Sequence, residues 1–159
     1  MGGAPIGTLT RMRCHICNSE MALQFRTRIL SKYEVAYFHC AACGYLCTEK
    51  PYWLEEAYSD AIVASDTGIL ARNRDVAKRL AVILYFVFGQ RGDARWLDFA
   101  GGYGILARMM RDYGYDFRWS DRYSKNLFAK GFESNAPSGY AGVTAIEAIE
   151  HSEDPFAFV

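Results

Sequence analysis

The sequence of 159 residues contains only four prolines and no low-complexity segment. It also lacks an excess of either charge, because 18 lysines and arginines balance 18 aspartates and glutamates. This balance excludes the broad positive field of a dedicated nucleic-acid-binding protein and leaves open only a local basic patch. Hydrophobic residues make up 51% of the chain, which excludes intrinsic disorder and is enough to form a buried core.

Long hydrophobic runs are missing as well. The longest one, residues 80–88, is far shorter than the roughly 20 residues that span a bilayer. The N-terminal stretch MGGAPIGTLTRMRC has no hydrophobic segment of the signal-peptide type. We therefore expect a cytoplasmic protein with no membrane partner. In that reducing compartment, metal binding or burial explains the five cysteines better than disulfides do.

The sequence pattern changes near residue 50. Short alternating segments between cysteine pairs predict a small β-rich, zinc-ribbon-like module over residues 1–50. From residue 51 to 159, strand-like and helix-like segments alternate, which predicts a parallel, doubly wound α/β domain. The elements expected there are a helix over 74–90 capped by Asn73 or Asp75, strands over 95–99, 117–120 and 142–149, helices over 105–113 and 124–130, and a short piece at 131–133.

Two further features concern the helices of this domain. The apolar residues of the helix over 74–90 recur at helical spacing: Val76, Leu80, Ile83, Leu84 and Val87. Near the end of the chain, Asp154 and Pro155 are the residue types of a helix N-cap and first turn. A parallel sheet that stopped here would leave its last strand bare, so we expect an incomplete sheet, belonging to a longer protein or a truncated copy.

Two CxxC motifs predict a metal site. Cys14 and Cys17 form the first pair, and Cys40 and Cys43 form the second. Each CxxC turn presents two thiolates to one metal ion, and two such turns complete the tetrahedral shell of a structural zinc ion. Such a site leaves no open position for catalysis, and its binding energy would hold together a module too small for a core of its own.

Other residues near these motifs could replace a ligand. Cys47 competes with Cys43, but the sequence Cys43-Gly44 suits the turn better because glycine tolerates unusual backbone angles. His15 and His39 each stand beside a cysteine of the pairs. With four cysteines available, we expect both histidines to be outside the metal shell or exposed.

The stretch WLDFAGGYGILA, residues 96–107, predicts a cofactor site. A strand ends in Asp98, and Gly101, Gly102 and Gly104 follow before a helix, which lets the backbone approach a ligand closely. The glycine spacing alone would also suit a dinucleotide. A carboxylate at Asp98 is unfavourable beside a pyrophosphate but can bind the α-ammonium group of S-adenosylmethionine (SAM). SAM is therefore the expected cofactor.

A second acid supports this interpretation. Asp121 ends the next predicted strand, where a carboxylate can accept hydrogen bonds from the two ribose hydroxyls of the cofactor. The alternative is a tight strand-to-helix turn with an exposed Asp121. Ala100 occupies the position before the glycines, and we expect an ordinary backbone angle there.

These motifs resemble those of class I SAM-dependent methyltransferases. LDFAGGYG is similar to their first motif, Asp121 to their ribose-binding acid, and GVTAIEAIEHSEDP to their fourth strand and the loop after it. The resemblance covers residues 50–159 and implies a Rossmann-like sheet. With a four-cysteine module in front, the chain is similar to sugar C-methyltransferases, in which the pair matching Glu150 and His151 is implicated in substrate deprotonation.

That resemblance implies catalytic roles for Glu150 and His151, at the carboxyl end of the fourth strand. His151 would act as general base, and Glu150 would orient its ring or bind a substrate hydroxyl. The alternative is that the pair only lines the cofactor pocket or caps the next helix. For Glu147, solvent or a salt bridge is expected rather than a cofactor contact.

The expected function is methylation of a small molecule, such as an activated sugar at carbon, without a nucleic-acid partner. One alternative is an rRNA or tRNA methyltransferase that grips RNA through the zinc module. Another is a non-catalytic zinc-ribbon interaction protein with a partial α/β domain. The sequence leaves open the methyl acceptor and the oligomeric state.

Overall fold

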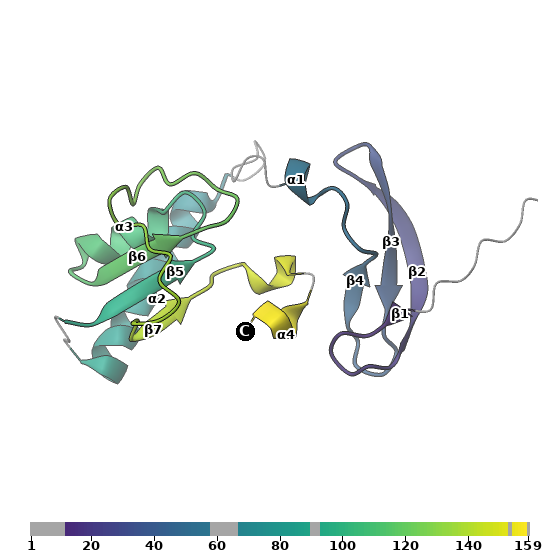
Figure 1. Ribbon diagram of the computed structural model, residues 1–159, viewed down its shortest axis with the longest axis horizontal. Helices are drawn as coiled ribbons and strands as arrows, with labels where there is room; N and C mark the ends of the chain where they lie inside the picture. The colour runs from purple at the N-terminus through teal and green to yellow at the C-terminus, as the bar shows by residue number, and fades with distance from the viewer. Residues whose placement is uncertain (1–11, 58–66, 90–92, 153, 159) are drawn as a thin grey trace, which may run out of the picture. The chain divides into compact units, whose positions relative to one another are not determined.

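The computed structural model describes residues 12–57, 67–89, 93–152 and 154–158 (Figure 1). Contacts divide the chain into two units, Met1–Leu54 with Ser152–Val159, and Glu55–His151. The first unit holds an antiparallel sheet and the second a parallel sheet. The predicted combination of a β-rich module with an α/β domain is therefore confirmed.

The first unit is a four-stranded antiparallel sheet of order β1-β2-β3-β4. Its strands are β1 (Met12–Arg13), β2 (Glu20–Ile29), β3 (Tyr33–His39) and β4 (Leu46–Thr48), and the short helix α1 (Leu54–Ala57) comes next in the chain. Among the described residues, its buried cluster contains Cys14, Met21 and Cys40, with four partly buried residues around them, and the other buried hydrophobic residues of the unit are Val35, Ala36 and Trp53. A core of this size is too small to hold a fold by hydrophobic burial alone.

The second unit is built on a three-stranded parallel sheet. Its elements are α2 (Ile69–Phe88), β5 (Arg95–Phe99), α3 (Ile105–Asp112), β6 (Asp116–Ser120), β7 (Gly142–Thr144) and the 3-10 helix η1 (Ile149–His151). The strand order is β6-β5-β7, and Trp119 and Glu133 add an isolated parallel bridge beyond β6. After β5, the chain pairs on one side of it as β6 and then on the other side as β7. A reversal of strand order of this kind places a crevice at the carboxyl ends of the strands.

The core of this unit lies between the sheet and two helices. Trp96 of β5 and Phe117 of β6 stack with ring centroids 6.3 Å apart. Ala77 and Leu84 of α2 and Met110 of α3 are buried in the same cluster. The strands over 95–99 and 117–120 and the helix over 105–113 agree with their predicted positions to within one residue.

Helix α2 differs from its prediction at its start and in its buried face. It begins at Ile69 after Gly68, so neither Asn73 nor Asp75 is its N-cap. The side chain of Asn73 instead donates a hydrogen bond to the Ile69 carbonyl one turn earlier (2.8 Å). The buried stripe centres on Ala77 and Leu84, which leaves Ile83 and Val87 exposed.

The predicted helix over 124–130 is wrong. Asp121 accepts the N–H groups of Tyr123 and Ser124, and Asn126 accepts that of Ala129 through its side chain. The N–H groups of residues 127 and 128 donate to the carbonyl of Tyr103. In a helix over 124–130, the N–H groups of residues 127 to 129 would donate to carbonyls four residues earlier, and here they donate to the Tyr103 carbonyl and the Asn126 side chain instead.

The predicted strand over 142–149 is also too long. β7 ends at Thr144, and Glu147 has a left-handed φ of 52°, which an extended strand does not accommodate. The chain then forms η1, so Glu147 lies on a turn and not on a strand.

The helix start predicted near the end of the chain is confirmed. Asp154 accepts hydrogen bonds from the N–H groups of Phe156 and Ala157 at 3.0 and 3.2 Å, as an N-cap does. Pro155 is the first residue of α4 (Pro155–Phe158).

Candidate cofactor and metal sites

The two CxxC turns have the same backbone geometry. The carbonyl of Cys14 accepts the N–H of Asn18, and that of Cys40 accepts the N–H of Gly44, at 2.9 and 2.8 Å. Asn18 and Gly44 both adopt a left-handed conformation, with φ of 59° and 80°. Asparagine and glycine are the residues that tolerate this conformation best, so the local sequence favours both turns.

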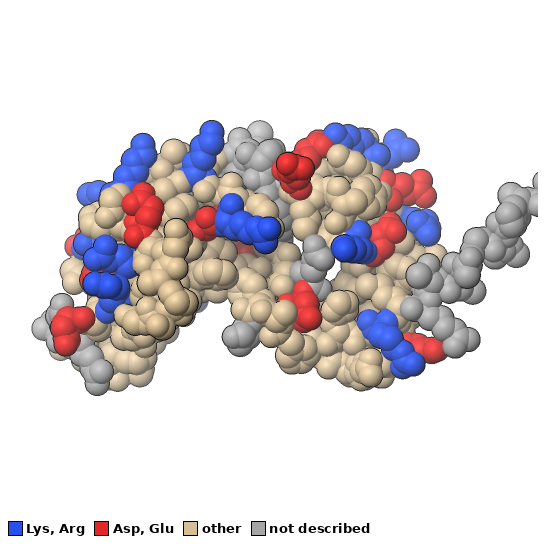
Figure 2. All heavy atoms as spheres, in the orientation of Figure 1, with Lys and Arg blue, Asp and Glu red and all other residues tan. Residues whose placement is uncertain are grey.

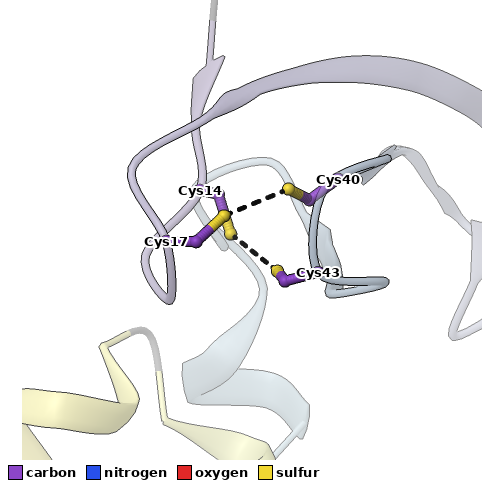
Figure 3. Close-up of side chains that lie close together, drawn as sticks. All are labelled: Cys14, Cys17, Cys40 and Cys43. Carbon is purple, nitrogen blue, oxygen red and sulfur yellow. Dashed lines mark hydrogen bonds between the residues drawn. The ribbon is translucent and has the colours of Figure 1, made fainter.

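These turns bring four thiols together (Figure 3). The Sγ atoms of Cys14 and Cys43 are 3.6 Å apart, those of Cys17 and Cys40 are 3.5 Å apart, and all four lie within 4.8 Å of one another. A tetrahedral shell with Zn–S bonds of about 2.3 Å places sulfurs about 3.8 Å apart. The donor set and its spacing therefore fit a zinc ion.

The competing ligands lie elsewhere among the described residues. Cys47 is half-buried on β4, where it pairs with Phe38 of β3, and it is not part of the four-thiol cluster. Neither His15 nor His39 belongs to the cluster. Without a metal ion the thiols perturb one another: hydrogen bonds from Ser19 lower the pKa of Cys17, whereas, against a hydrogen bond from the Tyr45 backbone, burial and hydrogen bonds with the other thiols raise the pKa of Cys43.

A cavity of about 290 Å³ opens at the carboxyl ends of β5 and β7. In parallel α/β sheets, ligands bind at this edge, where the strand order reverses. The lining residues come from α2, the loop after β5, the start of α3 and the turn after β7: Ile69, Arg72, Asn73, Val76, Asp98, Ala100, Gly101, Gly102, Tyr103, Ile105, Leu106, Ile146, Glu147 and His151.

Asp98 is the buried acid of this cavity, with an exposed fraction of 2%. Its Oδ1 accepts a hydrogen bond from the Thr144 hydroxyl at 3.0 Å, and its Oδ2 has no hydrogen-bond partner within the described residues. Burial raises the pKa of Asp98 from 3.8 to about 7. A buried carboxylate oxygen that lacks a donor fits a site for a cationic group.

The loop after Asp98 passes close over its side chain. A Cβ atom added to Gly101 would lie 2.7 Å from Asp98 Oδ2, so only glycine fits there. At Gly104, with φ of 84°, an added Cβ would lie 2.9 Å from that of Ala129. Ala100 has φ of 54°, so the expected ordinary angle is wrong, and the left-handed angle is strained for alanine.

Asp121 holds this loop in place. Its Oδ2 accepts the N–H of Gly102 at 2.9 Å, while its Oδ1 accepts the N–H groups of Tyr123 and Ser124. Sequence reasoning did not foresee this bond between Asp121 and the glycine loop. A carboxylate has about four acceptor positions, so these three bonds leave capacity for a ribose hydroxyl, and that role remains a prediction.

The residues after β7 divide into two groups. Glu147 and His151 line the cavity, whereas Glu150 is exposed and is not among its lining residues. Glu147 forms a salt bridge with Arg72 of α2, with Oε2 and Nε 3.2 Å apart, as the sequence reasoning favoured. Of the two residues proposed to be catalytic, His151 lines the cavity and Glu150 does not.

Sequence reasoning missed the contribution of α2 to the cavity. Arg72 and Asn73 were assigned to the segment before the helix, but they lie in its first turns and line the site. Thr144, which binds Asp98, was not singled out either. No sequence motif marks either residue, because Arg72 and Asn73 stand in a largely polar stretch that continues to Arg79.

Gly102 offers a test of the cavity. We expect Gly102→Ala to lower the affinity for SAM about tenfold or more, because its φ of 55° and open surroundings would place the new methyl group in the cavity. Gly114→Ala is the matched control, since φ is 90° and the surroundings are again open, but Gly114 does not line the cavity.

Both substitutions place alanine in the left-handed region, so thermal melts should show destabilisation of about 1–2 kcal/mol in each. Calorimetric titration with SAM should separate them. Equal affinities in the two variants would show that Gly102 does not face the ligand.

The parallel sheet, the glycine loop after its first strand and the buried acid before that loop define a Rossmann-like domain of the class I methyltransferase type. Residues 70–159 match the family model described as "Methyltransferase domain". The chain belongs to this family and is a SAM-dependent methyltransferase. The expected class of enzyme is thereby confirmed.

Two other searches gave negative results. No curated protein matches the chain. In the part of the chain that the structure describes, no helix has both the length and the apolar character needed to cross a bilayer.

Proposed function

We propose that the enzyme transfers the methyl group of SAM to a small molecule, with an activated sugar methylated at carbon as the acceptor class. The observation that carries this proposal is the cavity in which buried Asp98, the glycine loop and His151 come together. The four-cysteine module in front of the domain and the pair Glu150 and His151, which resemble features of sugar C-methyltransferases, support the acceptor class.

The residues of the cavity fit the parts of SAM. Asp98 Oδ2 would accept from the α-ammonium group, and the backbone at Gly101 and Gly102 would lie along the ligand. Gly104 and Asp121 are not among the lining residues. Asp121 binds the N–H of Gly102 beside the cavity, and from there it would accept hydrogen bonds from the ribose hydroxyls. When bound, SAM supplies an electrophilic methyl group on a positively charged sulfur. The four cysteines would hold a structural zinc ion.

His151 would act on the acceptor. A carbon next to a keto group loses a proton readily, and the imidazole of His151 would accept that proton to leave the enolate of the substrate. The enolate carbon would then form a bond to the methyl carbon as the methyl–sulfur bond breaks, with its electron pair left on sulfur in S-adenosylhomocysteine. The exposure of His151 at the cavity suits a group that meets an incoming substrate.

Charge supports a small acceptor over RNA. On the face drawn in Figure 2, basic and acidic side chains of the described residues are interspersed. The chain as a whole is balanced at net charge zero. Phosphate backbones are bound by surfaces of predominantly positive charge.

We expect His151→Ala to lower kcat by about 10²–10⁴-fold and to leave the affinity for SAM unchanged, because a general base acts on the acceptor. Turnover would be followed with a panel of nucleotide-activated keto-deoxysugars, by mass spectrometry of the methylated product. Exchange of the substrate C–H in D₂O without SAM should also be lost in the variant. Wild-type exchange in His151→Ala would refute the base assignment, and strongly salt-dependent RNA binding without sugar turnover would favour the RNA alternative.

A further inference from the structure

We propose that Arg72 is the residue that recognises the α-carboxylate of the methyl donor, and that Glu147 competes with the ligand for it. The proposal rests on the proposed function, since it assigns the second charged group of the SAM amino-acid head. Asp98 is assigned to the α-ammonium group, and a zwitterionic head needs an opposite charge for its carboxylate.

Arg72 supplies this positive charge in the cavity. Among its lining residues, as far as the structure describes them, Arg72 is the only arginine or lysine. It lies in the first turns of α2, where Nη1 would be 3.4 Å from a Cβ added to Gly68. A guanidinium presents five N–H donors in a planar fork, which matches the geometry of a carboxylate.

The salt bridge between Arg72 and Glu147 is weak enough for a ligand carboxylate to replace Glu147. The Nε and Oε2 atoms are 3.2 Å apart, but the side chains are 44% and 57% exposed. Ion pairs this exposed stabilise a fold little, so loosening this one costs little. A ligand held by the rest of the cavity presents its carboxylate at a high effective concentration, which favours it over Glu147.

The backbone conformation of Glu147 also supports the proposal. Glu147 adopts a left-handed φ of 52°, an angle rarely adopted by residues other than glycine, asparagine and aspartate. Strained conformations of this kind occur mainly at ligand sites and switch regions. The turn after β7 thus holds a carboxylate beside Arg72, in the position that the ligand carboxylate would take.

The test compares two ligands by calorimetry on the full chain. S-adenosylhomocysteine carries the amino-acid head, whereas 5′-methylthioadenosine lacks it. Arg72→Ala should weaken binding of S-adenosylhomocysteine about 10-fold to 100-fold and leave that of 5′-methylthioadenosine within about twofold. Arg72→Lys keeps the charge but not the fork and should give an intermediate loss.

Two further variants complete the test. Arg74→Ala, an exposed residue of the same helix outside the cavity, should leave both affinities unchanged. Glu147→Gln removes the competing carboxylate and should strengthen binding of S-adenosylhomocysteine severalfold. Thermal melts would show that each variant is folded.

The outcomes separate this inference from the proposed function. If wild-type protein binds S-adenosylhomocysteine and Arg72→Ala binds it equally well, the role of Arg72 is refuted while the methyltransferase site stands. Equal losses for both ligands, or weaker binding in Glu147→Gln, would also overturn it. Failure of the wild type to bind either ligand would instead refute the cofactor site itself.

Discussion

Replacement of Cys40 by serine is expected to release zinc and to unfold residues 12–50. The buried cluster around the thiols consists of Cys14, Met21 and Cys40, so two of its three members are predicted ligands. The other buried hydrophobic residues described in this unit are Val35, Ala36 and Trp53. Structural zinc supplies about 10–16 kcal/mol of apparent binding energy in zinc-finger peptides, which exceeds what so small a core provides. Metal analysis and hydrogen exchange of the β2 and β3 amides would measure both effects.

Cys47→Ser is the matched control for this experiment. Cys47 lies on β4 in the same unit and is half-buried, but its sulfur is outside the four-thiol cluster. Zinc content and amide protection should therefore be kept. Zinc retained at one equivalent with full protection in Cys40→Ser would refute the four-cysteine site.

The second large effect concerns Asp98. Asp98→Asn should weaken SAM binding about 10-fold to 100-fold, because it removes a charge-assisted hydrogen bond to the α-ammonium group. The amide oxygen can still accept from the Thr144 hydroxyl, so the fold should be kept. Calorimetry would measure the affinity, and unchanged affinity in a folded variant would contradict the assignment.

The pH dependence of binding follows from the same residue. Burial raises the pKa of Asp98 to about 7, so the carboxylate must lose its proton before it can pair with the ammonium group. In the limit that only the ionised form binds, SAM affinity falls by about tenfold per pH unit below pH 7. Comparison with Asp98→Asn separates this effect from the other ionisable groups of the cavity, including Glu147 and His151.

The stability of the ligand-free chain should change in the opposite direction. Because the folded-state pKa of Asp98 is higher than its ordinary value of 3.8, the folded chain binds more protons than the unfolded chain between these values. The contribution of Asp98 to stability therefore rises as pH falls through about 7 and levels off below about pH 4. Denaturant unfolding of wild type and Asp98→Asn at several pH values would show this difference.

Much of the candidate site could be predicted from short sequence motifs. The CxxC spacing predicted four thiols in one cluster, and the structure places their sulfurs within 4.8 Å of one another. β5, the glycine loop and α3 also occupy their predicted positions, because a buried strand, glycines and an amphipathic helix are encoded within about 20 residues. Both signals are local in the chain.

Predictions failed where long-range contacts override local preference. Residues 124–130 have a helical pattern, but the N–H groups of residues 127 and 128 donate to the carbonyl of Tyr103 in the loop after β5. The strand expected over 142–149 ends at Thr144, before the turn in which Glu147 pairs with Arg72, a residue 75 positions earlier (147 minus 72). The local pattern of a single sequence does not indicate which distant residues become hydrogen-bond or ion-pair partners.

By itself, the sequence determined the two kinds of sheet, the clustered cysteines and the acid before the glycine loop, because each depends on residue type and spacing over a short span. Only the tertiary structure decided that Asp98 has an oxygen without a hydrogen-bond partner among the described residues, that Asp121 binds the N–H of Gly102, and that Arg72 forms a salt bridge with Glu147. These features depend on which distant segments meet at the carboxyl ends of the strands, where burial and charge act through space and not along the chain.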